Sequence, residues 1–317
     1  MTHDEPAIHR RLATPVGFMN FDHVSVPRMS VPEASCDCHV HVFNPVQFPY
    51  VQNRTYTPGP AVVDALIAFE QRLGIDRVVL VQPSSYGTDN GCLLDSLARL
   101  GPTRARGVAV VDSATIKAKE VDALHAAGVR AIRINLEVKG EQDSARAGAA
   151  LRRALDFVAH TGWAVQVYAD TSVVLALSDE IAAAKTPIIL DHFGGLKSSH
   201  GLEGPGLATL VQLVKGSNVF IKLSAPYRVS KQAPDYADVA ACASALIAAA
   251  PDRILWASDW PHTGSSSSRG GDLSLVEPFR VENDGRTLDL LADWSPDENI
   301  RHQILVDNPA HLFSFEA

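Results

Sequence analysis

The chain has 317 residues, of which 46% are hydrophobic and 20% are charged, and its formal net charge at pH 7 is −8. This length can bury a large core in one or two domains. The sequence holds no cluster of Lys and Arg like those that bind nucleic acid or membrane surfaces, and no apolar stretch long enough to cross a bilayer. We therefore expect neither nucleic acid nor membrane as a partner.

Residues 1–34 contain several prolines and scattered charges without a sustained hydrophobic period, so we expect an extended arm laid over the domain. The apolar run after Arg10-Arg11 is too short and too broken for a secretory signal. The four cysteines are too few and too irregularly spaced for a disulfide scaffold in a chain of this length. The sequence therefore predicts reduced cysteines and a cytoplasmic location.

From residue 36 onward, short apolar runs alternate with longer segments whose apolar residues recur at helical spacing. The short runs predict eight strands, at residues 36–42, 77–82, 106–111, 129–135, 163–168, 187–191, 218–223 and 253–258. The longer segments predict helices at residues 61–73, 89–100, 113–127, 145–160, 171–184, 206–215 and 236–250. A Ser- and Gly-rich stretch, residues 263–286, follows the last strand and is either a mobile lid over a site or a loose surface loop.

Continuous apolar strands that alternate with helices suit a parallel sheet buried on both faces. We expect residues 35–317 to form a single α/β domain with the (β/α)8 architecture of a TIM barrel, preceded by the arm of residues 1–34. An open, doubly wound sheet is the alternative, and it is disfavoured because no Gly-rich phosphate-binding turn follows the first strand. The sequence leaves open whether the barrel forms a homo-oligomer.

The first strand carries Asp37, His39 and His41, which strict alternation places on one face, away from the thiols of Cys36 and Cys38. Two imidazoles on one strand face can converge on a metal ion, a water molecule or a carbonyl oxygen. In a barrel the chemistry lies at the carboxyl ends of the strands. Further polar residues are predicted at those ends: Gln82, Ser84, Asp112, Arg133, Asn135, Tyr168, Asp170, Asp191, His192, Lys222, Ser224, Arg228, Asp259 and His262.

Three segments stand together in barrel order: Asp-Cys-His-Val-His at 37–41, Asp-His-Phe-Gly-Gly at 191–195 and Ser-Asp-Trp-Pro-His at 258–262. With the closing Asn-Pro-Ala-His-Leu-Phe at 308–313, this combination resembles the amidohydrolase superfamily, in its amidohydrolase 2 branch. Within that branch the chain is most similar to the 2-pyrone-4,6-dicarboxylate lactonase group. The resemblance implies a hydrolase that opens a small anionic lactone. Relatives that act on sulfomuconolactone or galactarolactone are near alternatives, as is a zinc-dependent decarboxylase of the same superfamily.

The resemblance also implies residues that hold the carboxylates of the substrate, namely Ser84, Arg133, Tyr168 and Arg228. Lys139 stands where that group has a further arginine, and a lysine binds as a point charge without the fork geometry of arginine. Two of these residues have an alternative interpretation, because Arg133 and Arg228 could instead be paired with acidic neighbours. Lys222 is as compatible with a buried structural ion pair as with catalysis.

For the chemical step, Asp259 is the best candidate base, because a carboxylate at the end of strand eight faces the histidines of strands one and six. His39, His41 and His192 would polarise the lactone carbonyl and orient water. The same four residues are also a reasonable ligand set for one Zn²⁺. We expect no required metal, since the resembled lactonases work without one, and keep mononuclear zinc as the alternative. A non-catalytic barrel that binds sugar acids is a third hypothesis, which fits poorly with this intact set.

Overall fold

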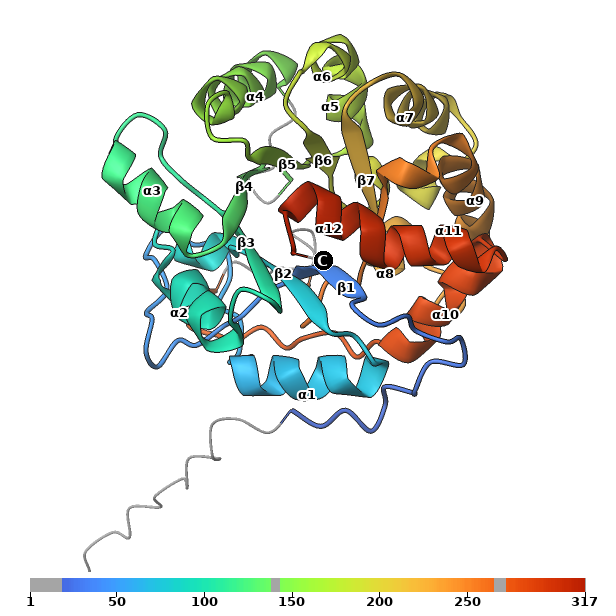
Figure 1. The fold of residues 1–317 in the computed structure, drawn as a ribbon, viewed down its shortest axis with the longest axis horizontal. Helices are drawn as coiled ribbons and strands as arrows, with labels where there is room; N and C mark the ends of the chain where they lie inside the picture. The colour runs from blue at the N-terminus through green and yellow to red at the C-terminus, as the bar shows by residue number, and fades with distance from the viewer. Residues whose placement is uncertain (1–18, 138–142, 265–271, 317) are drawn as a thin grey trace, which may run out of the picture.

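The computed structural model describes residues 19–137, 143–264 and 272–316. Its eight-stranded parallel sheet has the strand order β1 to β8, and helices surround it (Figure 1). The strands are β1 Cys36–Val40, β2 Arg77–Val81, β3 Ala105–Ala109, β4 Val129–Asn135, β5 Ala164–Tyr168, β6 Ile188–Leu190, β7 Val219–Ser224 and β8 Ile254–Ala257. The predicted (β/α)8 barrel is confirmed.

The main helices fall between the strands and after β8. They are α1 Val63–Leu73, α2 Gly91–Leu100, α3 Ala118–Ala126, α4 Ser144–Val158, α5 Thr171–Ala176, α6 Ser178–Ala183, α7 Pro205–Gly216, α8 Pro226–Val229, α9 Ala240–Ala249, α10 Asp284–Trp294, α11 Glu298–His302 and α12 Asn308–Phe313. Within the described ranges, no helix is long and apolar enough to span a membrane.

Three predicted boundaries are wrong. The helix expected over 171–184 is broken at Leu177, whose φ of −105° and ψ of 7° separate α5 from α6. The helix expected from residue 113 starts only at Ala118, because the Asp112 side chain accepts hydrogen bonds from Ala114 and Thr115 and holds a turn there. The loop after β8 ends at Asn283, which caps α10 by accepting from the backbone N–H of Arg286.

The barrel closes between β1 and β8. The backbone N–H of His41 donates to the carbonyl of Trp260 at 2.9 Å, and that of Asp259 donates to the carbonyl of His39 at 3.1 Å. The strict alternation expected for β1 does not hold, because its register shifts between Asp37 and Val40. Two consecutive residues therefore both face the barrel interior. Cys38 packs there in a cluster with Phe220, and the Nδ1 atom of His39 contacts Lys222.

The amino-terminal end of the barrel is covered by the end of the chain, as Figure 1 shows for α12. Phe313 and Phe315 belong to the interior cluster of strand residues. The Arg106 guanidinium donates to the carbonyls of Phe313 at 3.1 Å and Ser314 at 2.7 Å. The opposite end, where the predicted site residues lie, is therefore the accessible one.

Residues 19–34, part of the predicted arm, pack along α10. Ser25 donates its backbone N–H to Asn283 Oδ1 at 2.9 Å, and Arg28 is bonded to Asp289 through its backbone N–H and its Nε. A Cβ atom added at Gly285 would overlap the Ser25 carbonyl group. Only glycine permits this close approach of the arm to the first turn of α10.

We expect Gly285→Ala to lower the free energy of unfolding by about 1–3 kcal/mol, because the new methyl group must displace the arm. Chemical denaturation would measure the loss. Gly216→Ala in α7 is the matched control, since a Cβ there would meet nothing within 4 Å. That control should be neutral or stabilising by up to about 1 kcal/mol. Equal stability of the two variants would contradict the close packing of the arm on α10.

Candidate active site

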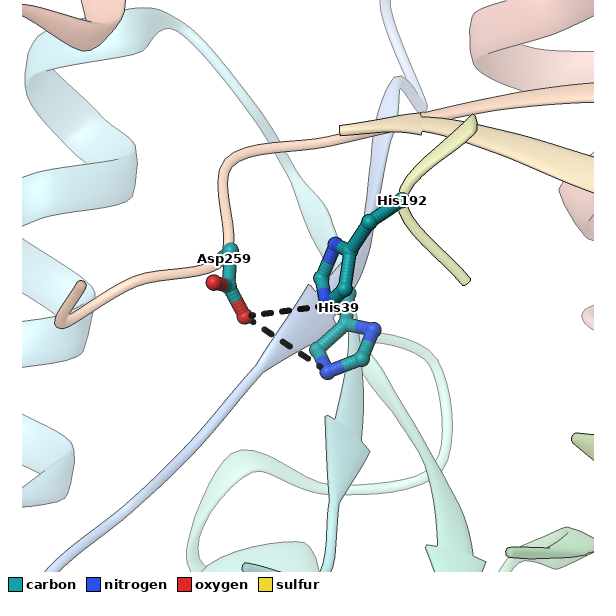
Figure 2. Close-up of side chains that lie close together, drawn as sticks. All are labelled: His39, His192 and Asp259. Atoms are coloured by element: carbon teal, nitrogen blue, oxygen red, sulfur yellow. Dashed lines mark ion pairs between the residues drawn. The ribbon is translucent and has the colours of Figure 1, made fainter. Parts of the chain in front are cut away.

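Three histidines and one aspartate converge at the carboxyl end of the barrel. The Nε2 atoms of His39, His41 and His192 lie 3.7, 3.8 and 3.8 Å from Asp259 Oδ1. Figure 2 shows His39 and His192 directed at the Asp259 carboxylate. All four side chains are buried. These separations are too long for direct hydrogen bonds. A water molecule or an ion between the side chains would satisfy the polar atoms that face one another.

Local backbone conformation directs two of these side chains into the site. Asp259 and His192 follow strand ends and have φ values of 68° and 48°. Residues other than glycine seldom adopt this left-handed region, which is costly by about 1–3 kcal/mol and clusters at functional sites. The surrounding structure must therefore hold both residues in place.

Asp37 supplies part of that support. Its carboxylate accepts from the backbone N–H groups of His39 at 3.1 Å and Ser258 at 3.1 Å, and so joins β1 to the residue before Asp259. Burial raises the pKa of Asp37 to about 7, although these donors favour the ionised form. Asp37 thus positions the site and does not face it.

The Asp259 carboxylate is held through one of its two oxygens. Tyr227 Oη and Arg228 Nε each lie 2.7 Å from Oδ2 and donate to it, so Oδ1 is left for the histidines. Burial alone would raise the pKa of Asp259, but Arg228 and the three histidines together outweigh burial and lower that pKa far below its ordinary value. Asp259 is therefore ionised throughout the working pH range, and it is a weak base while Arg228 contacts it.

The three histidines are uncharged near neutral pH. Burial lowers the pKa of His41 to about 4 and that of His192 to about 3, and it also lowers the pKa of His39. A neutral imidazole carries one N–H and one lone pair. His41 Nδ1 lies 2.7 Å from the Val81 carbonyl, which can only accept, so the lone pair of His41 is on Nε2. Because that lone pair faces Asp259 Oδ1, a hydrogen donor or a cation belongs between them.

The positions of these atoms fit a mononuclear metal site. His39, His192 and Asp259 each offer a ligand atom, and the three atoms lie within 4.8 Å of one another. Among the described residues, His39 Nε2 is a buried atom without a hydrogen-bond partner. Imidazole nitrogen and carboxylate oxygen are common zinc ligands, and His41 Nε2 would complete a set of four.

A second polar layer lies beneath His39. Lys222 Nζ donates to Gln166 Oε1 at 2.7 Å and lies 3.3 Å from Asp191 Oδ1. Arg133 Nη2 lies 3.5 Å from Asp191 Oδ2. Burial alone would raise the pKa of Asp191, but Lys222, His39 and Arg133 together outweigh burial, so the pKa is well below its usual value and the carboxylate is charged. The pairing of Arg133 and Lys222 with an acid, left open by the sequence, is therefore present.

Most of the predicted site residues, but not His39, line one small cavity of about 30 Å³, room for about one water molecule. Its lining residues are His41, Tyr56, Ser84, Arg133, Asn135, Glu137, Tyr168, His192, Arg228, Asp259, Thr263 and Gly264. An adjoining chamber of about 600 Å³ shares Ser84, Arg133 and Asn135 with it. A substrate ring needs more room than the small cavity offers, so side chains must shift when it binds. Lys139 and part of the loop, residues 265–271, lie outside the described residues.

Tyr227 and Gln166 are among the residues of this site that sequence reasoning missed. Tyr227 precedes Arg228 on the one-turn helix α8, so consecutive side chains both reach Asp259. The adjacency to Arg228 was a usable signal. Gln166 lies in the middle of β5, and only the pairing of β5 with its neighbours reveals its contact with Asp191.

Comparisons with known proteins show which family the chain resembles. A sequence model of the Amidohydrolase family matches residues 36–315. The chain is 35% identical to a 4-sulfomuconolactone hydrolase of Rhizobium radiobacter over 285 residues, which cover 90% of this chain and 91% of that protein. It is 31% identical to a 2-pyrone-4,6-dicarboxylate hydrolase of Comamonas testosteroni, with 91% and 93% covered. The apo crystal structure of an Agrobacterium tumefaciens protein superposes with a TM-score of 0.77 and 28% identity, covering 92% and 99%.

The raised pKa of Asp37 predicts a specific pH dependence of stability. Folded Asp37 keeps its proton up to about pH 7, whereas the unfolded chain loses it near pH 3.9. Stability from this group is therefore present at low pH and lost as the pH rises from about 4 to 7, at about 1.4 kcal/mol per pH unit. Asp37→Asn removes this loss, so its free energy of unfolding relative to wild type should rise across that window.

Chemical denaturation at a series of pH values measures this difference. Asp64→Asn is the matched control, because Asp64 is exposed and pairs with Arg99 on the surface. Its difference from wild type should stay within about 0.5 kcal/mol at every pH. A flat difference for Asp37→Asn as well would mean that the backbone donors keep Asp37 ionised.

Proposed function

The chain belongs to the amidohydrolase family, and we propose that it is a hydrolase that opens a small anionic lactone. The observation that carries this proposal is the convergence of His39, His41 and His192 on the free oxygen of Asp259, beside a cavity with cationic and hydroxyl groups. The two relatives described above are named as hydrolases of sulfomuconolactone and of a pyrone dicarboxylate, both anionic lactones. Galactarolactone is a further candidate substrate, and assays with a set of lactones would identify the preferred one.

The cavity supports an anionic substrate through donors that await an acceptor. In the described part of the chain, Arg133 Nε and Ser84 Oγ are buried and have no hydrogen-bond partner. A carboxylate or sulfonate would supply the missing oxygen atoms. We propose that Tyr168, Arg228 and Lys139 complete the binding of such groups.

In the proposed mechanism, Asp259 takes a proton from a water molecule held between its Oδ1 and the histidines. The water oxygen then bonds to the lactone carbonyl carbon, and the ring C–O bond breaks. Asp259 returns its proton to the ring oxygen that leaves. If Arg228 turns from Asp259 to the anionic group of the substrate, the pKa of Asp259 rises and the carboxylate becomes a stronger base. Substrate binding would thus activate the base.

The convergent atoms also support a second candidate, a mononuclear zinc enzyme that hydrolyses or decarboxylates its substrate. His39, His41, His192 and Asp259 would hold the metal, which when bound lowers the pKa of water and polarises a carbonyl group. Our preferred proposal requires no metal. The four cysteines, all within the described ranges, are buried and form no disulfide. We further propose that the enzyme acts in the cytoplasm, where these thiols would stay reduced.

Turnover of a panel of carboxylated and sulfonated lactones tests the function. We expect protein that has been analysed for metal and treated with chelator to hydrolyse at least one of them. Loss of activity on chelation and its return with Zn²⁺ would favour the zinc enzyme, and release of carbon dioxide would identify a decarboxylase. If no lactone reacts under either condition, the proposed function is wrong.

The role of Asp259 gives a separate prediction. Asp259→Asn should lower kcat for the lactone by about 10²–10⁴-fold, the usual contribution of a general base. KM should stay within about tenfold, because the substitution removes a base and not an anchor. Steady-state kinetics would measure both.

Tyr227→Phe is the matched control for that variant. It removes one donor to Oδ2 and keeps the carboxylate, so its loss in kcat should be much smaller. Equal losses for the two variants, or a loss of folded structure in Asp259→Asn, would remove Asp259 as the base.

A further inference from the structure

We propose that Lys222 holds His39 in the tautomer that carries its proton on Nε2, opposite to the tautomer of His41. Lys222 is then a positioning residue, because it makes His39 Nε2 a hydrogen-bond donor and not a metal ligand. The inference rests on the geometry of the buried layer beneath the site. It rests on the proposed function only for its catalytic consequence.

The contacts of His39 Nδ1 carry the first step. Lys222 Nζ lies 3.2 Å from this atom and is hydrogen-bonded to it. Asp191 Oδ1 is equally close, at 3.2 Å, yet within the described residues that oxygen has no hydrogen-bond partner. The orientation of the groups thus favours Lys222 over Asp191 as the partner of Nδ1.

The direction of this hydrogen bond follows from the other neighbours of Lys222. Gln166 Nε2 donates to Asp191 Oδ2 at 2.9 Å, which fixes the amide so that Oε1 faces Lys222. Lys222 Nζ donates to Gln166 Oε1 at 2.7 Å, and its charge is paired with the Asp191 carboxylate, whose Oδ1 lies 3.3 Å away. Its remaining hydrogen bond is to His39 Nδ1, and an ammonium group can only donate. Since Nδ1 accepts, the proton of the neutral His39 ring is on Nε2.

His41 has the reverse arrangement, because its Nδ1 must donate to the Val81 carbonyl at 2.7 Å. The site thus combines an N–H of His39 with the lone pairs of His41 Nε2 and Asp259 Oδ1. One donor and two acceptors around a single point suit a water molecule, whose oxygen accepts from His39 while its hydrogens face His41 and Asp259. This arrangement directs a water hydrogen at the proposed base.

The same arrangement opposes a metal ion, which needs a lone pair on His39 Nε2. Metal-bound histidines usually donate their other N–H to a carboxylate or a carbonyl group. Asp191 Oδ1 is placed to accept such a bond, but Lys222 competes for Nδ1. Without Lys222, His39 can move its proton to Nδ1, toward Asp191, and present a free Nε2.

The tautomers can be measured directly on chelator-treated wild-type protein with ¹⁵N-labelled histidine. Long-range ¹H–¹⁵N correlation spectra distinguish a proton on Nδ1 from one on Nε2, and His39→Gln and His41→Gln variants assign the signals. We expect His39 to carry its proton on Nε2 and His41 on Nδ1. A proton on Nδ1 of His39 would overturn the inference. Because no substrate is present, this outcome would leave the proposed lactone hydrolysis untouched.

Lys222→Met gives the second test. Its His39 proton should move to Nδ1, and its affinity for Zn²⁺ should rise by about 10–100-fold over wild type, the range known for residues behind metal ligands. Arg133→Met is the matched control, because it removes a positive charge 3.5 Å from Asp191, whereas the group hydrogen-bonded to His39 Nδ1 is Lys222. It should leave the His39 tautomer unchanged.

Zn²⁺ titration followed by calorimetry measures the affinities. An equal rise for Lys222→Met and Arg133→Met would mean that charge alone acts, and it would overturn the role of Lys222. If Lys222→Met does not fold, the wild-type spectrum still decides the tautomer.

Discussion

The hydrogen bonds that close the barrel between β1 and β8 are made by residues to which we assign the proposed chemistry. Asp259 donates its backbone N–H to the carbonyl of His39, and His41 donates to the carbonyl of Trp260. The separation of these imidazoles from the Asp259 carboxylate is thus fixed by backbone pairing and not by side-chain packing alone. Barrel closure and assembly of the site are one event, so a change that loosens the β1–β8 seam must also disperse the site.

Buried charge is the second constraint. Asp191 and Asp259 are among the carboxylates that are essentially removed from water. Each is compensated by nearby cations: Lys222 in β7 and Arg133 in β4 for Asp191, and Arg228 in α8 for Asp259. An unpaired charge in this environment would cost several kcal/mol. The two ion pairs also differ in their access to a ligand. Lys222 is fully buried, whereas Arg228 lines the cavity, where an anionic ligand could compete with Asp259 for it.

The barrel and most of the site were predictable from sequence, because short apolar runs give strands and parallel strands bring their carboxyl ends to one rim. The motifs around His39, His192 and Asp259 converge for that reason. The register shift in β1 was not predictable, since it depends on pairing with neighbouring strands. For the same reason, the direction of Lys222 toward His39 could not be read from residues 218–223, whose pattern records burial but not partners.

The small cavity and its larger neighbour share Ser84 and Arg133 as a common wall. A ligand that arrives through the larger chamber meets this wall, with its guanidinium and hydroxyl groups, before it reaches Asp259. The charge of the ligand would then be recognised by these groups before its reactive carbonyl group reached Asp259. A neutral ester would lack the anionic group that these side chains can bind, so it would be disfavoured before it reached the proposed base.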